Sequence, residues 1–332
     1  MATIKDVAKE AGVSVATVSR VINNSPKASA ASINSVKQAM TKLGYRPNAN
    51  ARALVSQSTQ TVGVLVADVS DPFFGTLVKA ADNIAHAHGK HLLVCNGYHH
   101  ADQEKAAIEL LINSRCDSLI IHSKALSDDE LIRYAAEVKG MVLINRYISE
   151  LADRCISLDN HRGAYLATEF LIRNGHTKIA HIASSHAIED TDARIDGYLD
   201  AMRDNHLEPS RSYIEYGEPD SEGGELATQN LLMKAVDFTA VVAYNDYMAV
   251  GALSVFEENA IHVPQQVSIV GFDDGLLAKY VHPKLTTIRY PIQLMAERAA
   301  NLSLQLAKGE RPDSGSNRFA PTIVRRMSVE KI

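Results

Sequence analysis

From residue 61 onward the sequence alternates short, nearly continuous apolar runs with longer amphipathic segments, and no other feature restricts the fold as much. Strands that are apolar on both sides belong to parallel sheets that helices cover on both faces. The runs form two successive series of about 100 residues each, the size of a small domain. We therefore expect an α/β body with two similar lobes, each built on a parallel sheet. The expected strands are 61–68, 92–95, 119–121, 141–144, 179–183, 212–216, 240–243 and 267–272, and the expected helices are 77–87, 107–111, one near Leu131, 163–173, 192–204, 224–233 and 247–258.

Polar residues gather directly after several of these strands. Ligands of open parallel sheets bind beyond the carboxyl ends of the strands, and between two lobes that region becomes a cleft. Carboxylates, amides and guanidinium groups bridge neighbouring hydroxyls, and aromatic rings stack on apolar sugar faces, so these residues suit a small polyhydroxylated ligand. Each of them taken singly also suits a turn or a helix cap, and only their convergence favours a ligand site. The segments concerned are 68–74, 145–146, 245–246 and 273–274.

The first 46 residues follow a different pattern, that of three short helices. Thr3 and Asp6 have the spacing of a helix N-cap and its reciprocal partner, and Gly12 offers the left-handed geometry of a helix end. Ser14 can cap a second helix only two residues later. Two short helices separated by a tight glycine turn predict a helix-turn-helix unit, and a third helix that closes at Gly44 completes its core.

In a helix-turn-helix unit the N-terminal turn of the second helix enters the major groove of DNA. Here that turn carries Val15, Ala16 and Thr17, with Ser19 and Arg20 one turn later. Arg20 can donate two hydrogen bonds to a guanine edge, whereas Val15 and Ala16 offer only apolar contacts. Val15 has a second interpretation, as part of the core of the head.

Charge is distributed unevenly along the chain. Residues 1–60 contain eight basic and two acidic side chains, a net charge of +6, so the total of −5 leaves −11 on the remainder. A basic head on an acidic body favours contact of the head with a polyanion, although a solvated basic face would look the same.

The segment from residue 47 to residue 60 joins head and body. Residues 48–54 are alanine-rich and have helix propensity, but about two turns are too short to form a stable helix alone in water. We expect a connector that becomes helical only when it is held, with Leu54 as an apolar wedge for a minor-groove step. The alternative is a plain flexible linker.

Several other classes of function lack support in the sequence. The N-terminus has no apolar signal segment, and no run of about 18 apolar residues predicts a membrane span, so we expect a cytoplasmic protein without membrane contact. Three cysteines without Cys-x-x-Cys spacing argue against a disulfide framework or a zinc site, and we expect no cofactor. Phosphate-binding and nucleophile-elbow motifs are absent. Residues 184–186 (Ser-Ser-His) are a weak nucleophile-and-base candidate, so we expect no enzyme. Residues 98–100 (Tyr-His-His) lack a spaced third metal ligand, and we interpret them as a polar loop from which one member reaches the cleft.

The combination of motifs resembles the lactose/galactose repressor family over essentially the whole chain. The resemblance implies a helix-turn-helix head, a hinge helix, and a body like periplasmic sugar-binding proteins, in which the chain crosses between the lobes three times. The motifs that carry it are residues 3–8, 12–14, 17–23, 47–54, 68–74, 243–246, 270–274, 285–288 and 321–326. The divisions that it implies are 1–46 for the DNA-binding domain, 47–60 for the hinge helix and linker, 61–159 with 290–320 for the N-terminal lobe, and 160–289 with 321–332 for the C-terminal lobe.

Residue by residue, the resemblance also implies two binding sites. The expected partners are double-stranded operator DNA and a small sugar effector. The residues expected to contact DNA are Ser14, Val15, Ala16, Thr17, Ser19, Arg20, Asn23, Arg52 and Leu54. The residues expected to bind the effector are Asp71, Phe73, Phe74, His122, Asn145, Arg146, Arg194, Asn245 and Asp273.

Within the family the chain is most similar to the galactose-responsive branch, which implies repression of galactose genes and release from a palindromic operator by D-galactose. The sequence has no leucine-rich heptad tail after residue 326, so we expect a homodimer. A different sugar, a co-repressor that promotes DNA binding, or a sugar-binding protein without regulatory coupling are the alternatives.

Overall fold

The computed structural model describes residues 2–23, 25–46, 60–208, 211–310 and 317–332. The chain forms two compact units, a small one within the first 60 residues and a large one that begins at Thr61. The hinge segment 47–59, for which the sequence predicts a connector, lies outside the described residues.

The small unit contains three helices, α1 (Ile4–Ala11), α2 (Val15–Ile22) and α3 (Ala30–Leu43). Thr3 and Asp6 form the expected capping box, and Gly12 ends α1 with a φ of 66°. The hydroxyl of Ser14 accepts the backbone N–H of Thr17 and so starts α2. The helices bury a small apolar core, whose fully enclosed members are Val7, Val18 and Val36, with Ala8, Val21 and Ala39 beside them.

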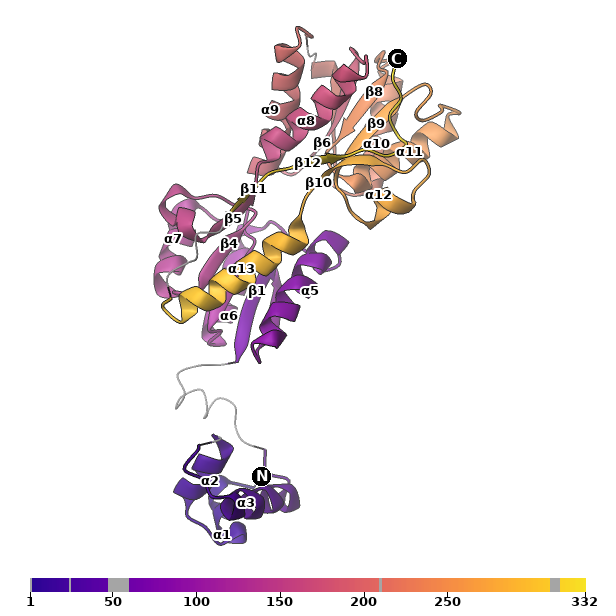
Figure 1. Cartoon of the computed structure of the whole chain (residues 1–332). Helices are drawn as coiled ribbons and strands as arrows, with labels where there is room; N and C mark the ends of the chain where they lie inside the picture. The colour runs from indigo at the N-terminus through magenta and orange to yellow at the C-terminus, as the bar shows by residue number, and fades with distance from the viewer. Residues whose placement is uncertain (1, 24, 47–59, 209–210, 311–316) are drawn as a thin grey trace. The chain divides into compact units, whose positions relative to one another are not determined.

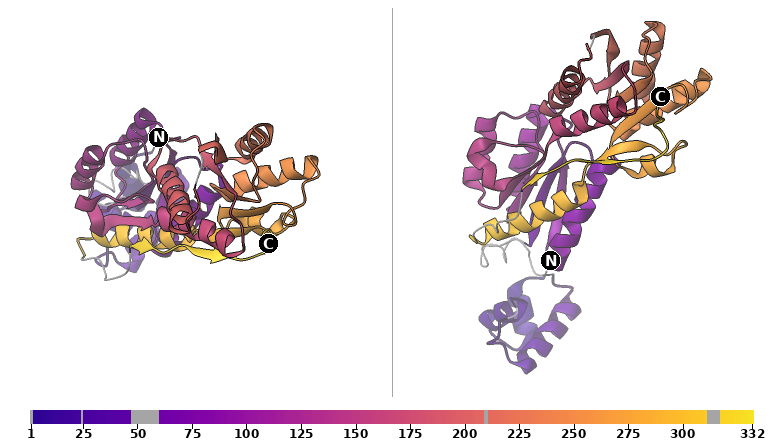
Figure 2. Two further views of the ribbon diagram at one scale, coloured as in Figure 1. Left: turned by 90° about the horizontal axis from the view of Figure 1, so that it is seen from above. Right: turned by 45° about the horizontal axis from the view of Figure 1, so that its top comes forward.

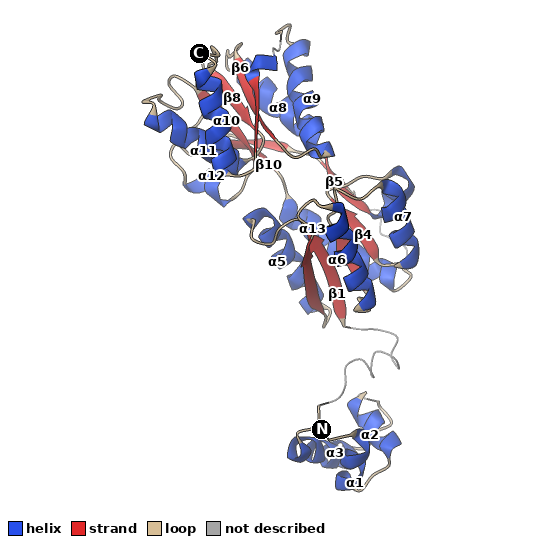
Figure 3. Ribbon diagram, turned by 180° about the vertical axis from the view of Figure 1, so that it is seen from behind, coloured by secondary structure: helices blue, strands red, loops and turns tan. Residues whose placement is uncertain are grey.

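The N-terminal lobe of the large unit is a six-stranded sheet in the order β11-β5-β4-β3-β1-β2, with every pair parallel. Helices α5 and α13 pack together on one face, and α6 covers the other (Figures 1 and 3). The strands are β1 (Thr61–Val66), β2 (His91–Asn96), β3 (Ser118–Ile121), β4 (Met141–Ile144), β5 (Cys155–Leu158) and β11 (Arg318–Phe319). The helices are α5 (Pro72–Ala87), α6 (Ala101–Asn113), α7 (Asp128–Glu137) and α13 (Ile292–Ala307), with a 3-10 helix at Ser149–Arg154.

The C-terminal lobe repeats this architecture with the order β12-β10-β9-β8-β6-β7, in which only β12 runs antiparallel to its neighbour. Helices α8 and α9 pack on one face, and α10 and α11 on the other (Figure 1). The strands are β6 (Ile179–Ser184), β7 (Ile214–Gly217), β8 (Ala240–Ala243), β9 (Ser268–Asp273), β10 (Thr286–Arg289) and β12 (Thr322–Val324). The helices are α8 (Asn160–Arg173), α9 (Glu189–Asp204), α10 (Ser221–Met233), α11 (Asp246–Glu258) and α12 (Leu276–Tyr280), with a 3-10 helix at Arg211–Tyr213.

Three crossings join the lobes. The chain leaves the first sheet after β5, returns between β10 and α13, and leaves again between β11 and β12, where the last segment runs along both lobes (Figure 2). The helix-turn-helix head and the two-lobed parallel body with three crossovers confirm the predicted fold class. No described helix is long and apolar enough to cross a bilayer.

The helices begin earlier than their apolar periodicity predicts. Asp71 caps α5, so this helix starts at Pro72 instead of residue 77, because a proline at the first position lacks only an N–H that would be unpaired anyway. The sequence also gave no sign of β5 (Cys155–Leu158), which is short and follows β4 after a single 3-10 turn. Four residues with one cysteine and one serine are too few to stand out from a loop.

Candidate functional site

Helix α2 presents exposed residues from its N-cap, Ser14, to its C-cap, Asn23. Ser14, Val15, Ala16, Arg20 and Asn23 are exposed, while the valines on the opposite side of the helix are buried. Val15 is 42% exposed. The interpretation that places Val15 in the core of the head is therefore wrong. An apolar side chain that is exposed at a helix end is available for contact with another molecule.

Thr17 and Ser19 stand at the edge of this surface and are partly buried. The Thr17 hydroxyl lies 2.9 Å from the Ser14 hydroxyl, and the Asn23 amide donates to the Ser19 hydroxyl at 3.4 Å. Contact of these residues with DNA stays a prediction, and Arg52 and Leu54 lie outside the described residues.

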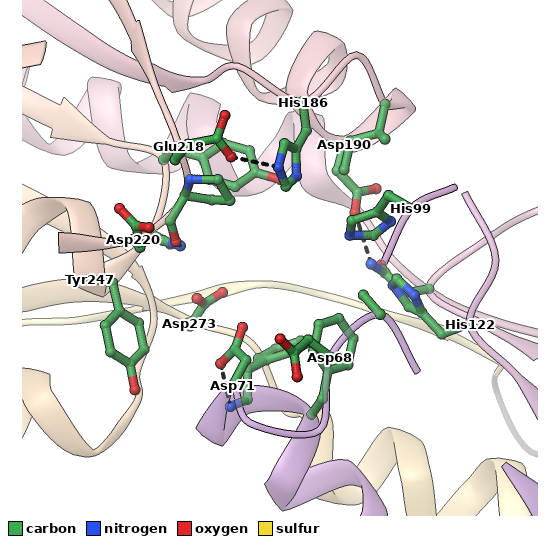
Figure 4. Close-up of a pocket in the computed structure, with 18 of the residues that line it drawn as sticks. Asp68, Asp71, His99, His122, His186, Asp190, Glu218, Asp220, Tyr247 and Asp273 are labelled. Carbon is green, nitrogen blue, oxygen red and sulfur yellow. Dashed lines mark hydrogen bonds and ion pairs between the residues drawn. The ribbon is translucent and has the colours of Figure 1, made fainter. Parts of the chain in front are cut away.

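A cavity of about 510 Å³ lies in the large unit, between the carboxyl ends of the two sheets. This volume falls in the range of small-ligand sites. Figure 4 shows acidic side chains and imidazoles around an open centre. Of the predicted effector residues, those that line the cavity are Asp71, Phe73, Phe74, His122, Asn145, Arg194, Asn245 and Asp273.

Aromatic rings form one wall of the cavity. The Phe73 ring meets the Phe74 ring edge to face at 5.2 Å and the Tyr290 ring at 4.9 Å, and Phe74 meets the His122 ring at 4.8 Å. Phe73 and Phe74 follow the Asp71 cap at the start of α5, so the cap that begins the helix also sets both rings. Such a wall offers an apolar surface to one face of a ligand.

Arg194, on α9, is the buried cation of the cavity. Its Nε donates to Asn160 Oδ1 at 3.0 Å, another of its guanidinium nitrogens donates to the Tyr244 carbonyl, and its guanidinium lies 3.7 Å from the centre of the Phe272 ring. These contacts fix the plane of the guanidinium, which leaves its remaining N–H groups in a set direction.

Asn145, directly after β4, and Asp273, the last residue of β9, adopt left-handed backbone geometry. Asn145 has a φ of 58° and Asp273 a φ of 112°. Asparagine and aspartate tolerate this region better than other non-glycine residues, but 112° is strained even for aspartate. The Asp273 side chain lines the cavity, where Figure 4 shows it between the two lobes.

Burial changes the preferred charge of several groups around the cavity. Burial raises the pKa of Asp273 well above its usual value, although the Arg194 guanidinium lowers it, and burial also raises the pKa of Asp71. Burial lowers the pKa of His99 to about 4, assisted by His186 and Lys124. Neutral imidazoles both donate and accept hydrogen bonds, so this cavity suits the hydroxyl groups of an uncharged ligand.

Arg146 is the exception among the predicted effector residues. Its guanidinium donates to Asp128 Oδ1 at 2.7 Å and to the Ser123 carbonyl at 3.1 Å, and it lines a second cavity next to the first. The structure therefore places Arg146 beside the effector cavity and not among the residues that line it, and a contact of Arg146 with the effector stays a prediction.

Several lining residues escaped the sequence analysis. His186 lies in the loop between β6 and α9, and Asp190 lies in the first turn of α9, where acidic side chains are so common that Asp190 resembles an ordinary helix start. His99 lies in the loop after β2, the polar loop from which we expect one member to reach the cleft, and Tyr98 and His99 both have left-handed φ values. The lining residues that were not predicted from the strand ends include His99, His186, Asp190, Glu218, Pro219, Asp220, Tyr244, Tyr247 and Tyr290.

The serine-histidine segment at 184–186 does not form a nucleophile and base. The His186 ring bonds Glu218 at 2.9 Å, and the Ser184 hydroxyl accepts the His186 backbone N–H at 3.1 Å. The Ser185 hydroxyl also donates to Glu218, at 2.6 Å. These serines therefore lack an imidazole placed to take their proton. Among the described residues, no three histidine, cysteine or acidic side chains are placed to hold a metal ion.

Similarity to known proteins covers both units. Residues 3–48 match the model of bacterial regulatory proteins of the lacI family, and residues 59–315 match that of periplasmic binding proteins and the sugar binding domain of the LacI family. The HTH-type transcriptional regulator GalR of Escherichia coli (strain K12) is 52% identical over 99% of this chain and 96% of its own length. The regulator GalS of Salmonella typhimurium (strain LT2) is 52% identical over 99% of this chain and 97% of its own length. The solved lac repressor dimer bound to operator and the anti-inducer ONPF is 27% identical, with a TM-score of 0.87 over 99% of both chains.

Proposed function

Because the chain belongs to the LacI family of bacterial regulatory proteins, we propose that it represses galactose transport and utilisation genes and that D-galactose is its effector. It is a DNA-binding transcriptional regulator and not an enzyme. The repressor acts in the cytoplasm as a homodimer, in which two heads bind the two halves of a palindromic operator.

The exposed end of α2 supports the DNA-binding part of the proposal. Arg20 reads a guanine edge, and Val15 and Ala16 make apolar contacts with neighbouring bases. Ser14, Thr17, Ser19 and Asn23 add hydrogen bonds to phosphates or base edges. Arg52 and Leu54, in the segment that joins head and body, also contact DNA, with Leu54 as the wedge in the minor groove.

The interlobe cavity carries the effector part of the proposal. Its acidic, amide and imidazole groups face an aromatic wall, an arrangement that suits the hydroxyls and the apolar face of a single hexose. Asp71, Asn145, Arg194, Asn245 and Asp273 bind the hydroxyls. The similarity to GalR and GalS favours D-galactose among the hexoses.

Linkage between the two sites produces regulation. Without sugar, the dimer holds its two hinge segments side by side on the operator. The bound sugar favours a lobe arrangement that separates them, and the affinity for the operator falls. The sugar shifts this equilibrium only by the difference in its affinity for the two arrangements.

A gel shift on a galactose operator fragment, with and without D-galactose, tests this function. We expect nanomolar binding that saturating D-galactose weakens, and little effect of D-glucose at the same concentration. Undiminished binding in D-galactose, together with release by another small molecule, would remove galactose as the effector and leave the repressor assignment intact.

A further inference from the structure

Lys124 is a lysine buried in the wall between the two lobes, and the effector contacts proposed above do not use it. It follows β3 in the N-terminal lobe, and its side chain is only 1% exposed. Its Nζ donates to Glu189 Oε1 at 2.7 Å and to Asp190 Oδ1 at 2.9 Å, both at the start of α9 in the C-terminal lobe. A buried ammonium group is costly unless it is paired, so this lysine needs both lobes in their present arrangement.

The N-terminal lobe holds Lys124 from behind. The buried Glu104 carboxylate accepts the backbone N–H groups of Lys124 at 3.2 Å, Ala125 at 3.1 Å and Leu126 at 3.3 Å, and also the Ser123 hydroxyl. One carboxylate therefore fixes the whole turn from which the lysine side chain starts. The ion pairs still cost the lysine side chain its rotamer freedom, but the backbone from which it starts is already fixed.

On the opposite side, Lys124 orients groups that line the effector cavity. Asp190 Oδ2 accepts the Asn145 amide at 2.8 Å, and Asp190 Oδ1 accepts the Asn160 amide at 3.1 Å in addition to the lysine. The Lys124 ammonium also donates to the Asn145 carbonyl, and the Tyr290 hydroxyl donates to the Asn145 side chain. Asp190 and Asn145, one from each lobe, thus reach the cavity in orientations that Lys124 helps to set.

We propose that Lys124 is a positioning residue that fastens the two lobes to each other and holds Asp190 and Asn145 toward the effector. The fastening follows from the contacts of the protein alone, and the effect on the effector rests on the proposed function. Lys124 does not itself line the cavity.

The charge of Lys124 has a second, measurable consequence within the cavity. Burial lowers the pKa values of His99 and His122, and the nearby ammonium of Lys124 lowers both further, while Asp190 raises them. His186 and His100 are the other titratable groups that act on His99. Removal of the lysine charge would therefore raise the pKa values of both imidazoles, whereas a lysine that only filled space would leave them unchanged.

A double-mutant cycle on the full chain without sugar tests the fastening. Lys124→Met removes the cation that pairs with Asp190. Asp190→Asn leaves the half-exposed Glu189 as the remaining carboxylate partner of Lys124. Each single change should therefore lower the urea concentration at the midpoint of unfolding. The double variant should recover stability, with a coupling of about tenfold or more in the unfolding equilibrium constant. Lys178→Met is the matched control, because Lys178 pairs with Asp237 on the surface of one lobe.

Two further measurements complete the test. Calorimetry should show that Lys124→Met weakens D-galactose binding about tenfold or more and that Lys178→Met leaves it unchanged. Histidine NMR titration should show higher pKa values for His99 and His122 in Lys124→Met and not in Lys178→Met. Additive stability changes in the cycle, or unshifted imidazoles, would overturn the role of Lys124. If the unmodified chain takes up no D-galactose, the proposed function fails, while the sugar-free cycle still decides on Lys124.

Discussion

At the ends of the strands, some residues that line the cavity adopt conformations and charge states that are unfavourable for folding. Asp273 is partly buried in a strained conformation, and burial raises its pKa, so that its ionised form is disfavoured there. The neighbouring Asp274 restrains it, because this carboxylate pairs with Arg289 at 2.9 Å and also with Arg326. The ion pairs of Asp274 thus help to hold the strained backbone of Asp273 in place.

Asp246 holds the same loop through hydrogen bonds. We expect its ionisation to make the stability of the protein depend on pH. Its Oδ1 accepts the Thr287 hydroxyl at 2.6 Å, and its Oδ2 accepts the backbone N–H of Gly275 at 2.8 Å. Burial raises the pKa of Asp246 to about 7, against the opposing effect of these hydrogen bonds.

A raised pKa means that the folded state favours the protonated carboxyl. The stability from this group is fully present below its unfolded value of 3.8 and is lost as the pH rises toward about 7. The loss is at most about 1.4 kcal/mol per pH unit for one proton. We predict that Asp246→Asn removes this part of the decline, so that the urea midpoint of the variant relative to the unmodified chain rises between pH 5 and pH 7. Asp237→Asn, at an exposed position, should show no such trend, and parallel curves for Asp246→Asn would contradict the prediction.

Among the elements, helix α2 shows most clearly how local sequence places function. Ser14 begins the helix, Val18 and Val21 bury one side, and the remaining side carries the exposed residues. A helix of eight residues is too short to be stable alone, so packing against α1 and α3 maintains the surface that we expect to meet DNA.

Arg20→Ala tests this surface. We predict a loss of about 1–3 kcal/mol in operator binding and a much smaller loss on unrelated DNA, because a bidentate contact to guanine is specific to sequence. Lys37→Ala removes the same charge from an exposed position on α3 and should weaken both kinds of binding alike. Fluorescence anisotropy on operator and scrambled duplexes at one salt concentration provides the measurement. Equal losses on both duplexes for Arg20→Ala would assign Arg20 to the phosphates.

In the whole molecule, regulation requires that operator binding and sugar binding change each other's affinity through a single coupling free energy. Thermodynamic linkage is reciprocal, so the factor by which D-galactose weakens operator binding must equal the factor by which operator weakens D-galactose binding. We predict a factor of about 5–150 in each direction, the usual range of allosteric coupling. Anisotropy titrations with operator at zero and saturating sugar, and calorimetry with sugar at zero and saturating operator, yield the two factors. Unequal factors, or a factor of one, would show that the sites are not linked as proposed.

The alternation of strands and helices, the three helices of the head and part of the cavity lining can be predicted from the sequence alone. These features are local or periodic: Thr3 with Asp6, Ser14 with Gly12, and the polar residues that follow apolar runs. Asp71, Phe73 and Asp273 were therefore predictable, because parallel strands bring their carboxyl ends to one edge of a sheet.

Tertiary structure decided the contacts between residues that are far apart in the chain. Arg146 and Arg194 look alike as candidates, yet Asp128 holds the first outside the cavity, while Asn160 and Tyr244 hold the second inside it. The pairing of Lys124 with Asp190 joins two lobes across 66 positions, and no local pattern reports it. The physical reason is that a charge is stabilised by whichever partner the fold brings within hydrogen-bonding distance, and separation along the chain does not reveal that distance.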